Sequence, residues 1–176
     1  ADLFHFLLVI SSSSSQRARM RIIGENNGMS ETQETPVLSP ALYLQREGVR
    51  QYSATNPRGA QVLIGDGPGR FSPGELLKIA VAGCNAMSSD KRLTDRLGED
   101  FEQVVAVSAQ YLEGEDRFTH FDVELIQDLS SVDEEERQKM IRRASGAIER
   151  NCTIGHTVTK GATYEKTFTN ESVSED

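Results

Sequence analysis

The segment between Ser72 and Gly98 constrains the fold most, because it contains both ends of one long helix. Ser72 is followed by Pro73 and, three residues on, by Glu75. This is the S-x-x-E capping box, with proline at the first helical position. Gly98 is a typical residue just past a helix end. We therefore predict a helix that starts after Ser72 and runs to about Leu97.

The first half of this helix is apolar on nearly every side. From Leu76 to Met87 the only charged residue is Lys78, whereas the second half, "SSDKRLTDRLG", is amphipathic. A helix that is apolar all round is usually buried on all sides. We expect a central helix.

The residues before the helix predict three short strands. The stretch 41–65 alternates apolar and polar residues, and "REG" at 46–48 and "NPRG" at 56–59 are turn signals. Together they predict an antiparallel meander, followed by a loop at 66–70.

The residues after the helix predict a hairpin, a second helix and a last strand. Val105, Val107, Ala109 and Tyr111 share one strand face, Phe121, Val123 and Leu125 share another, and "EGED" joins the two strands. Ser131 with Glu134 resembles a second capping box, followed by an apolar stripe at helical spacing: Met140, Ile141, Ala144, Ala147 and Ile148.

A Thr-rich turn to Gly161 and a strand at 163–168 complete the order βββ-α-ββ-α-β. This order predicts the α+β class with a mostly antiparallel sheet.

Residues 41–170 form one predicted domain, between a leader at 1–40 and a polar tail at 171–176. "LFHFLLVI" lacks the preceding positive charges and the small-residue cleavage site of a signal peptide. We expect the leader to be disordered or vector-derived. An upstream-extended start is the alternative for 1–28, with the natural beginning at Met29.

Composition excludes several functions. The net charge of −8 and the acidic composition argue against binding to nucleic acid or anionic membranes. No apolar run reaches the roughly 18 residues of a membrane span. Two cysteines are too few for a secreted disulfide framework, and CxxC, HxH and HExxH spacings are absent, so we expect a cytoplasmic protein without a zinc site. An apolar fraction of 37% with 6% aromatics suits a domain that completes its core against a partner subunit.

Cys84 in "AGCNAMSS" has two interpretations. It is either a buried small hydrophobe or a reactive thiol. Ala82, Gly83 and Ala86 remove bulk around it, and Asn85, Ser88 and Ser89 supply hydrogen-bond donors. These neighbours leave space for a small substrate and a means to hold a thiolate.

Cys152 lies where the second predicted helix passes into a turn, and it is either incidental or a partner of Cys84. The two thiols meet only if the two helices pack side by side. In that case Cys152 can resolve a sulfenic acid on Cys84 into a disulfide. His156 is either a base facing Cys152 or a plain surface residue.

Two segments resemble the OsmC/Ohr family of thiol-dependent hydroperoxide reductases. "SPGELLKIAVAGC" is similar to the family's "(N/S)PEELL-x-AA-x-AGC", and "AIERNCTIGHTV" to its "CP-x-S-x-x-L" segment. The resemblance covers roughly residues 41–170, including the order of elements.

This resemblance implies an intertwined homodimer with two sites at the subunit interface. Cys84 would reduce an organic hydroperoxide to the alcohol, Cys152 would resolve the sulfenic acid, and an external dithiol would reduce the disulfide. No cofactor is implied.

The resemblance also implies an arginine that stabilises the thiolate and a glutamate that holds it. Arg46, in "QREGVR", matches one family placement and Arg70 another. Gly74 occupies the glutamate position, so Glu75 is the nearest substitute, with helix capping as its other role. Thr153 replaces the proline that commonly follows the second cysteine.

Two other functions stay open. Gly74 in place of the glutamate favours a non-catalytic binding protein with unreactive thiols. A dithiol oxidoreductase acting on protein thiols is the third hypothesis.

Overall fold

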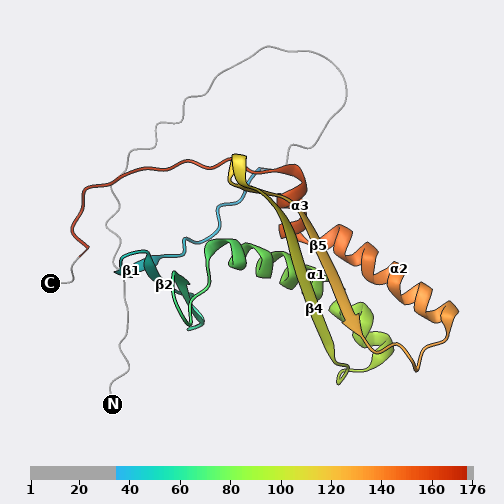
Figure 1. Cartoon of the computed structure of the whole chain (residues 1–176). Coiled ribbons are helices and arrows are strands. Elements are labelled where there is room, and N and C mark those ends of the chain that lie inside the picture. Colours follow the sequence, from blue (N-terminus) through green and yellow to red (C-terminus); the bar gives the residue numbers. More distant parts are fainter. Residues whose placement is uncertain (1–34, 174–176) are drawn as a thin grey trace, which may run out of the picture. The chain divides into compact units, whose positions relative to one another are not determined.

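The computed structural model describes residues 35–173. The chain divides after Pro40 into two units, and every helix and strand within residues 35–173 lies in the second. Residues 1–34 of the predicted leader at 1–40 lie outside the described residues. The elements of the second unit combine helices with antiparallel strands (Figure 1), which confirms the predicted α+β class.

The first three strands form the predicted antiparallel meander. They are β1 (Leu44–Gly48), β2 (Gln51–Thr55) and β3 (Gln61–Gly65), in the order β1-β2-β3. Asn56 closes the second turn, because its side-chain oxygen accepts from the backbone N–H groups of Arg58 (2.9 Å) and Ala60 (3.0 Å). Gly65 has a φ of 132°, and a β-carbon there would collide with the Arg50 carbonyl. Glycine is therefore required at the end of β3.

Helix α1 (Pro73–Leu97) begins as predicted. The Ser72 hydroxyl accepts from the Glu75 backbone N–H at 3.2 Å, and the Glu75 carboxylate accepts from the Ser72 N–H at 2.7 Å. Both bonds satisfy N–H groups that a helix start otherwise leaves open. The Gly98 N–H bonds to the Thr94 carbonyl at the other end. Helix α1 is consequently fixed at both ends.

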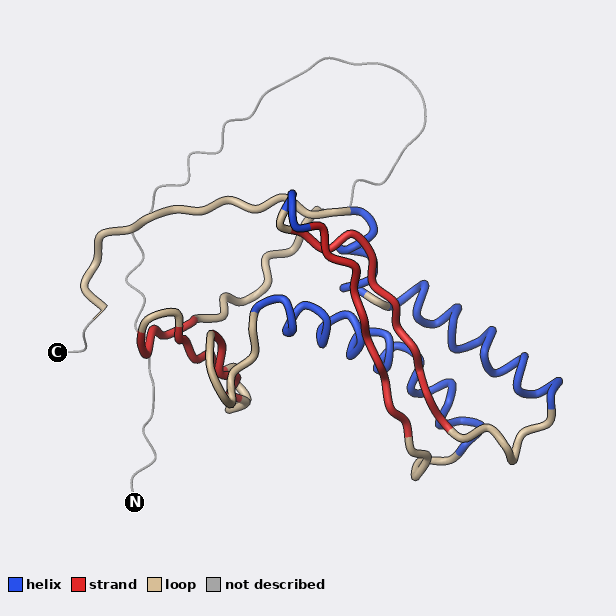
Figure 2. The backbone as a smooth tube through the Cα atoms, in the orientation of Figure 1, coloured by secondary structure: helices blue, strands red, loops and turns tan. Residues whose placement is uncertain are grey.

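Strands β4 (Gln103–Leu112) and β5 (Arg117–Gln127) form the predicted hairpin, joined by the 3-10 turn Glu113–Glu115 (Figure 2). Burial alternates along both strands, which confirms the predicted faces except at Tyr111, where the register shifts after Gln110 and the side chain is 51% exposed. Val105 faces Leu125 and Val107 faces Val123 across the pair. Both strands contact α1, so the apolar face of the hairpin packs on the helix.

Helix α2 (Glu134–Asn151) packs against α1. The core cluster consists of Leu93, Met140 and Ala144, with Leu97, Phe101 and Leu129 against it. The predicted cap at Ser131 is wrong: Asp133 is the N-cap and accepts from the Glu136 N–H at 2.9 Å. A turn closed by the bond from the Val132 N–H to the Leu129 carbonyl takes up Ser131, so the helix starts later. Asp and Ser are comparable caps, and tertiary packing selects between them.

The end of the chain differs from the prediction in two ways. Residues Thr153–Lys160 form helix α3, where a turn was predicted, because the Cys152 sulfur caps it. The predicted strand at 163–168 is wrong: residues 161–173 have no regular secondary structure (Figure 1). A strand needs the hydrogen bonds of a neighbouring strand. Within the described residues, none pairs with this segment.

Helix α1 contacts β4, β5, α2 and α3, yet it is not covered on all sides. Val81 and Ala82 are buried, whereas Met87 is 82% exposed and Leu77 and Ile79 are 40% and 47% exposed. The expected all-round burial is therefore not reached within one chain. No helix in residues 35–173 has both the length and the apolar character to cross a membrane.

Candidate active site

The fold brings the two cysteines together, as their predicted cooperation requires. Cys84 lies in α1 and Cys152 at the junction of α2 and α3, and α1 contacts both of those helices. Both are free thiols, and their side chains hydrogen-bond to each other. The fold thus brings two thiols that are separated by 67 residues of sequence within hydrogen-bonding range.

Cys152 is the buried member of the pair, at 2% exposure. Its sulfur accepts from the Gly155 backbone N–H at 3.2 Å and lies 3.8 Å from Nδ2 of Asn85. Burial, together with the hydrogen bond to Cys84, raises the pKa of Cys152. Cys152 therefore stays a protonated donor next to Cys84. A β-carbon at Gly155 would lie 3.0 Å from the sulfur, so glycine is needed there.

Cys84 has the opposite electrostatic environment. Burial by itself raises the pKa of a thiol, but hydrogen bonds from the Cys152 thiol, the N–H groups of Ile154 and Gly155, and the Ser88 hydroxyl outweigh it. The net effect lowers the pKa of Cys84. The thiolate is the nucleophilic form of cysteine, so Cys84 is the more reactive thiol of the two.

The residues around Cys84 match their predicted roles only in part. A β-carbon at Gly83 would meet nothing within 4 Å, so α1 has open space on the side of the residue that precedes Cys84. Asn85 donates to the Val81 carbonyl at 2.8 Å and directs the same nitrogen at Cys152. Ser89 differs, because its buried hydroxyl donates to the carbonyls of Asn85 and Ala86, both at 3.0 Å. Of the three predicted donors, Asn85, Ser88 and Ser89, it is Ser88 that donates a hydrogen bond to the Cys84 sulfur.

His156 does not act on either thiol in this arrangement. Its exposed ring donates from Nε2 to the Glu149 carbonyl at 2.7 Å. That carbonyl belongs to the last turn of α2, where helix carbonyls lack internal partners. The surface interpretation of His156 fits this contact.

Arg46 and Arg70 lie in different surroundings. Arg46 is exposed on β1, opposite Tyr52. Arg70 lies just before α1 with its side chain only 15% exposed, and it donates to the Tyr52 carbonyl at 3.1 Å and to the Glu47 carboxylate at 2.6 Å. Among the described residues, neither arginine bonds to a cysteine. Pro73 and Cys84 are separated by about 16 Å along the helix, so Arg70 lies far from Cys84 of its own chain.

Glu47 was missed by sequence reasoning. Its hydrogen bonds from Arg70 and then from the Ser53 hydroxyl lower the pKa of this carboxylate. The signal was present in "QREGVR", where Glu47 directly follows Arg46; in the structure Glu47 lies where the register of β1 shifts, between Arg46 and Gly48. Glu75, the predicted substitute, is held by the capping box, and its bonds to Ser72 lower its pKa.

Gly74 has a packing explanation. A β-carbon there would lie 3.1 Å from Cζ and 3.3 Å from Cε2 of Phe118 on β5. Phe118 in turn stacks against Tyr111 and Phe121, with ring centroids 5.7 and 5.4 Å away. A side chain at position 74 therefore requires the Phe118 ring to shift by a few tenths of an ångström within this aromatic cluster.

Comparisons with known proteins agree with this architecture. The family model described as "OsmC-like protein" matches residues 65–165. An uncharacterised protein of Mycobacterium tuberculosis is 41% identical over 124 residues, which is 69% of this chain and 90% of the relative. An uncharacterised protein of Mycobacterium bovis matches to the same extent.

Two solved structures share the fold at low identity. A hypothetical protein of Aquifex aeolicus has a TM-score of 0.56 at 12% identity, over 71% of this chain and 90% of that one. A protein of Psychrobacter arcticus, provisionally named an osmotic stress induced and detoxification response protein, has a TM-score of 0.53 at 15% identity, over 68% and 88%.

Proposed function

Because the chain belongs to the OsmC-like protein family, we propose that it is a cysteine-based peroxidase that reduces organic hydroperoxides to alcohols. One observation carries this proposal: the hydrogen-bonded pair of Cys84 and Cys152, whose pKa values shift in opposite directions. A two-cysteine peroxidase needs one thiolate and one protonated thiol within reach of it. The pair supplies both.

In the first step the Cys84 thiolate attacks one oxygen of the hydroperoxide. A sulfur–oxygen bond forms, the oxygen–oxygen bond breaks, and the leaving alkoxide takes up a proton to become the alcohol. The sulfur loses two electrons and becomes a sulfenic acid. The open space beside Gly83 is where the substrate approaches.

In the second step the Cys152 sulfur attacks the Cys84 sulfenic acid. A disulfide forms and the hydroxyl leaves as water, which takes the Cys152 proton. The Gly155 N–H, already bonded to the Cys152 sulfur, stabilises the developing thiolate. An external dithiol returns both cysteines to thiols by exchange, and this requirement fits a cytoplasmic protein.

Arg70 is the arginine of the site in this proposal, in preference to Arg46, and Glu47 rather than Glu75 holds it. The support is the 2.6 Å ion pair between Arg70 and Glu47, which leaves Glu75 to its helix cap. Since Arg70 is remote from Cys84 along its own helix, it serves the Cys84 of a second chain. The protein then acts as a homodimer.

Exposed apolar surface on α1 supports this homodimer. Leu77, Ile79 and Met87 lie on the same helix as Cys84 and are not covered within one chain. Residues 161–173 also have no neighbouring strand within the described part of the chain. A second copy of the chain would bury the exposed apolar residues of α1 and supply a neighbouring strand for residues 161–173.

The test is a single-turnover titration with an alkyl hydroperoxide. Reduced protein should consume one equivalent and form a Cys84–Cys152 disulfide, identified by mass spectrometry. Cys152→Ser should consume one equivalent but stop at a sulfenic acid that a dimedone probe traps. Consumption by Cys84→Ser at the wild-type rate would refute the proposal.

A non-catalytic binding protein is the second candidate. Gly74, which replaces the family's glutamate, favours it, and so does the lack of any bond between an arginine and Cys84 among the described residues. It predicts an alkylation rate for Cys84 with the pH dependence of an ordinary thiol.

A further inference from the structure

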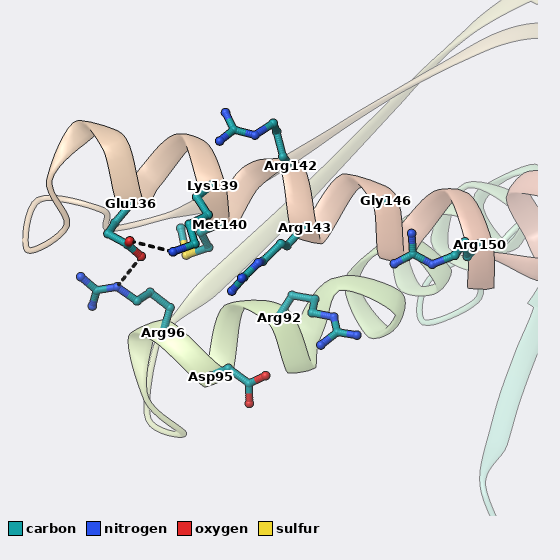
Figure 3. Close-up of a pocket in the computed structure, with 10 residues that line it drawn as sticks. All are labelled: Arg92, Asp95, Arg96, Glu136, Lys139, Met140, Arg142, Arg143, Gly146 and Arg150. Carbon is teal, nitrogen blue, oxygen red and sulfur yellow. Dashed lines mark hydrogen bonds and ion pairs between the residues drawn. The ribbon is translucent and has the colours of Figure 1, made fainter.

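A basic groove lies between the second half of α1 and helix α2 (Figure 3). Its volume is about 730 Å³. The lining contains two carboxylates, Asp95 and Glu136, against six cations: Arg92, Arg96, Lys139, Arg142, Arg143 and Arg150. The whole chain carries a net charge of −8, so this concentration of positive charge runs against the overall composition. We call this feature the basic groove.

The two carboxylates of the basic groove are already engaged. Glu136 pairs with Arg96 at 3.8 Å and with Lys139 at 3.1 Å. Asp95 pairs with Lys91 at 2.7 Å, and Lys91 does not line the groove. Asp95 also attracts Arg92 electrostatically, so the two carboxylates leave Arg142, Arg143 and Arg150 of the lining without an acidic partner.

Three arginines of α2, Arg142, Arg143 and Arg150, form no hydrogen bond or ion pair within the part of the chain that the structure describes. In Figure 3, Arg143 and Arg150 extend along the space between the helices, Arg92 approaches from α1, and Arg142 points away from α1. Arg92, Arg143 and Arg150 therefore reach the same groove from two helices.

The backbone also makes room for these side chains. A β-carbon at Gly146 would lie 3.1 Å from Nη1 of Arg150, so the absence of a side chain lets this guanidinium lie against α2. Met140, only 4% exposed, adds an apolar contact to the lining. The basic groove thus combines several guanidinium groups with a small apolar surface.

We propose that the basic groove binds a small anion with adjacent phosphate groups. Guanidinium groups bond to phosphate oxygens through two parallel N–H donors, and several unpaired arginines around one space match several neighbouring phosphates. The volume falls within the range of small-molecule sites. Two sources share this chemistry: a nucleoside polyphosphate and an inorganic polyphosphate. The inference stands independently of the peroxidase proposal.

Calorimetric titration of the full chain at physiological ionic strength tests the proposal. The probes are ATP, AMP, inorganic tripolyphosphate and citrate. ATP and tripolyphosphate should bind at least about tenfold more tightly than AMP and citrate. The single phosphate of AMP and the carboxylates of citrate form fewer paired N–H···O bonds with the guanidinium groups. A tighter ATP complex identifies a nucleotide, and equal affinities identify the inorganic chain. Citrate binding as tight as tripolyphosphate binding would overturn the proposal.

Variants tie the binding to the groove. Arg143→Ala and Arg150→Ala should each weaken tripolyphosphate binding at least about tenfold, since each removes charge-assisted hydrogen bonds. Gly146→Ala should weaken it as well, by displacing Arg150, without removing a charge. Arg58→Ala is the matched control, because it removes one exposed arginine in the turn between β2 and β3.

The control should keep the wild-type dissociation constant, and thermal unfolding checks that every variant folds. Equal weakening in Arg58→Ala would show that only net charge matters. No binding up to millimolar tripolyphosphate, with a change in dimer dissociation for Arg143→Ala, would show that a second copy covers the groove. Either result overturns the proposal.

Discussion

Gly74 lies against the ring of Phe118. The backbone of α1 approaches the ring so closely that a β-carbon at residue 74 would lie 3.1 Å from Cζ. This contact joins the start of α1 to strand β5. It also disfavours any side chain at residue 74, where the resemblance to the family led us to expect a carboxylate. The carboxylate that pairs with an arginine is Glu47, on a different element.

Gly74→Ala should destabilise the fold by about 1 kcal/mol, because overpacking against Phe118 exceeds the helix propensity that alanine gains. In the background of Phe118→Leu, which removes the ring, the same change should be neutral or stabilising. Urea unfolding of the four proteins of this double-mutant cycle measures the coupling. Equal effects in both backgrounds would show that the contact does not limit residue 74.

Ser88→Ala should raise the pKa of Cys84, because one of the hydrogen bonds that lower it is removed. In the wild type the pH at which alkylation reaches half its maximal rate should lie below that of an ordinary thiol, and Ser88→Ala should move this pH upward. Ser89→Ala is the control, since its hydroxyl donates to backbone carbonyls. A wild-type midpoint at the ordinary thiol value would contradict the proposed reactivity.

Cys152→Ala should lower the free energy of unfolding by about 1 kcal/mol and raise the pKa of Cys84. Alanine cannot accept from the Gly155 N–H at the start of α3 or donate to Cys84. Cys152→Ser keeps a hydroxyl in the same place, so both effects should be smaller. Chemical unfolding and alkylation against pH measure them, and identical values for the two variants would argue against the cap.

Glu47→Gln should lower kcat/KM for the hydroperoxide, because Arg70 loses its ion pair. Glu75→Ala should instead lower the melting temperature, because it removes the acceptor of the Ser72 N–H in the capping box, and leave kcat/KM of the folded protein unchanged. Steady-state peroxidase assays and thermal melts separate the two roles. The reverse pattern would restore Glu75 as the residue that holds the arginine.

The sequence was most informative where local chemistry decides the structure. Ser72 and Glu75 fix the helix start by their own bonds, and the alternation of β4 and β5 follows from burial of one face. The predicted N-cap of α2 was wrong by two residues, because Ser131 and Asp133 both fit the local sequence pattern. The turn that begins at Leu129 takes up Ser131 and leaves Asp133 as the cap.

Features that depend on distant contacts could not be predicted. The pairing of Glu47 with Arg70 joins residues 23 positions apart, and the steric need for Gly74 comes from Phe118 on another element. The segment 163–168 has strand-forming residues, but strand formation depends on a partner that the described chain does not provide. Cys84 and Cys152 were predicted to meet, whereas the direction of each pKa shift required the structure.

The sulfur of Cys152 is also the N-cap of α3, through the bond from Gly155. Disulfide formation replaces the contact between the two thiols with a covalent bond of about 2 Å, which shifts the Cys152 sulfur relative to the Gly155 N–H, so oxidation disturbs the bond on which the first turn of α3 depends. Order in α3 is then tied to the oxidation state of the pair. Amide hydrogen exchange at Gly155 would therefore report each redox cycle from the backbone, without any probe on sulfur.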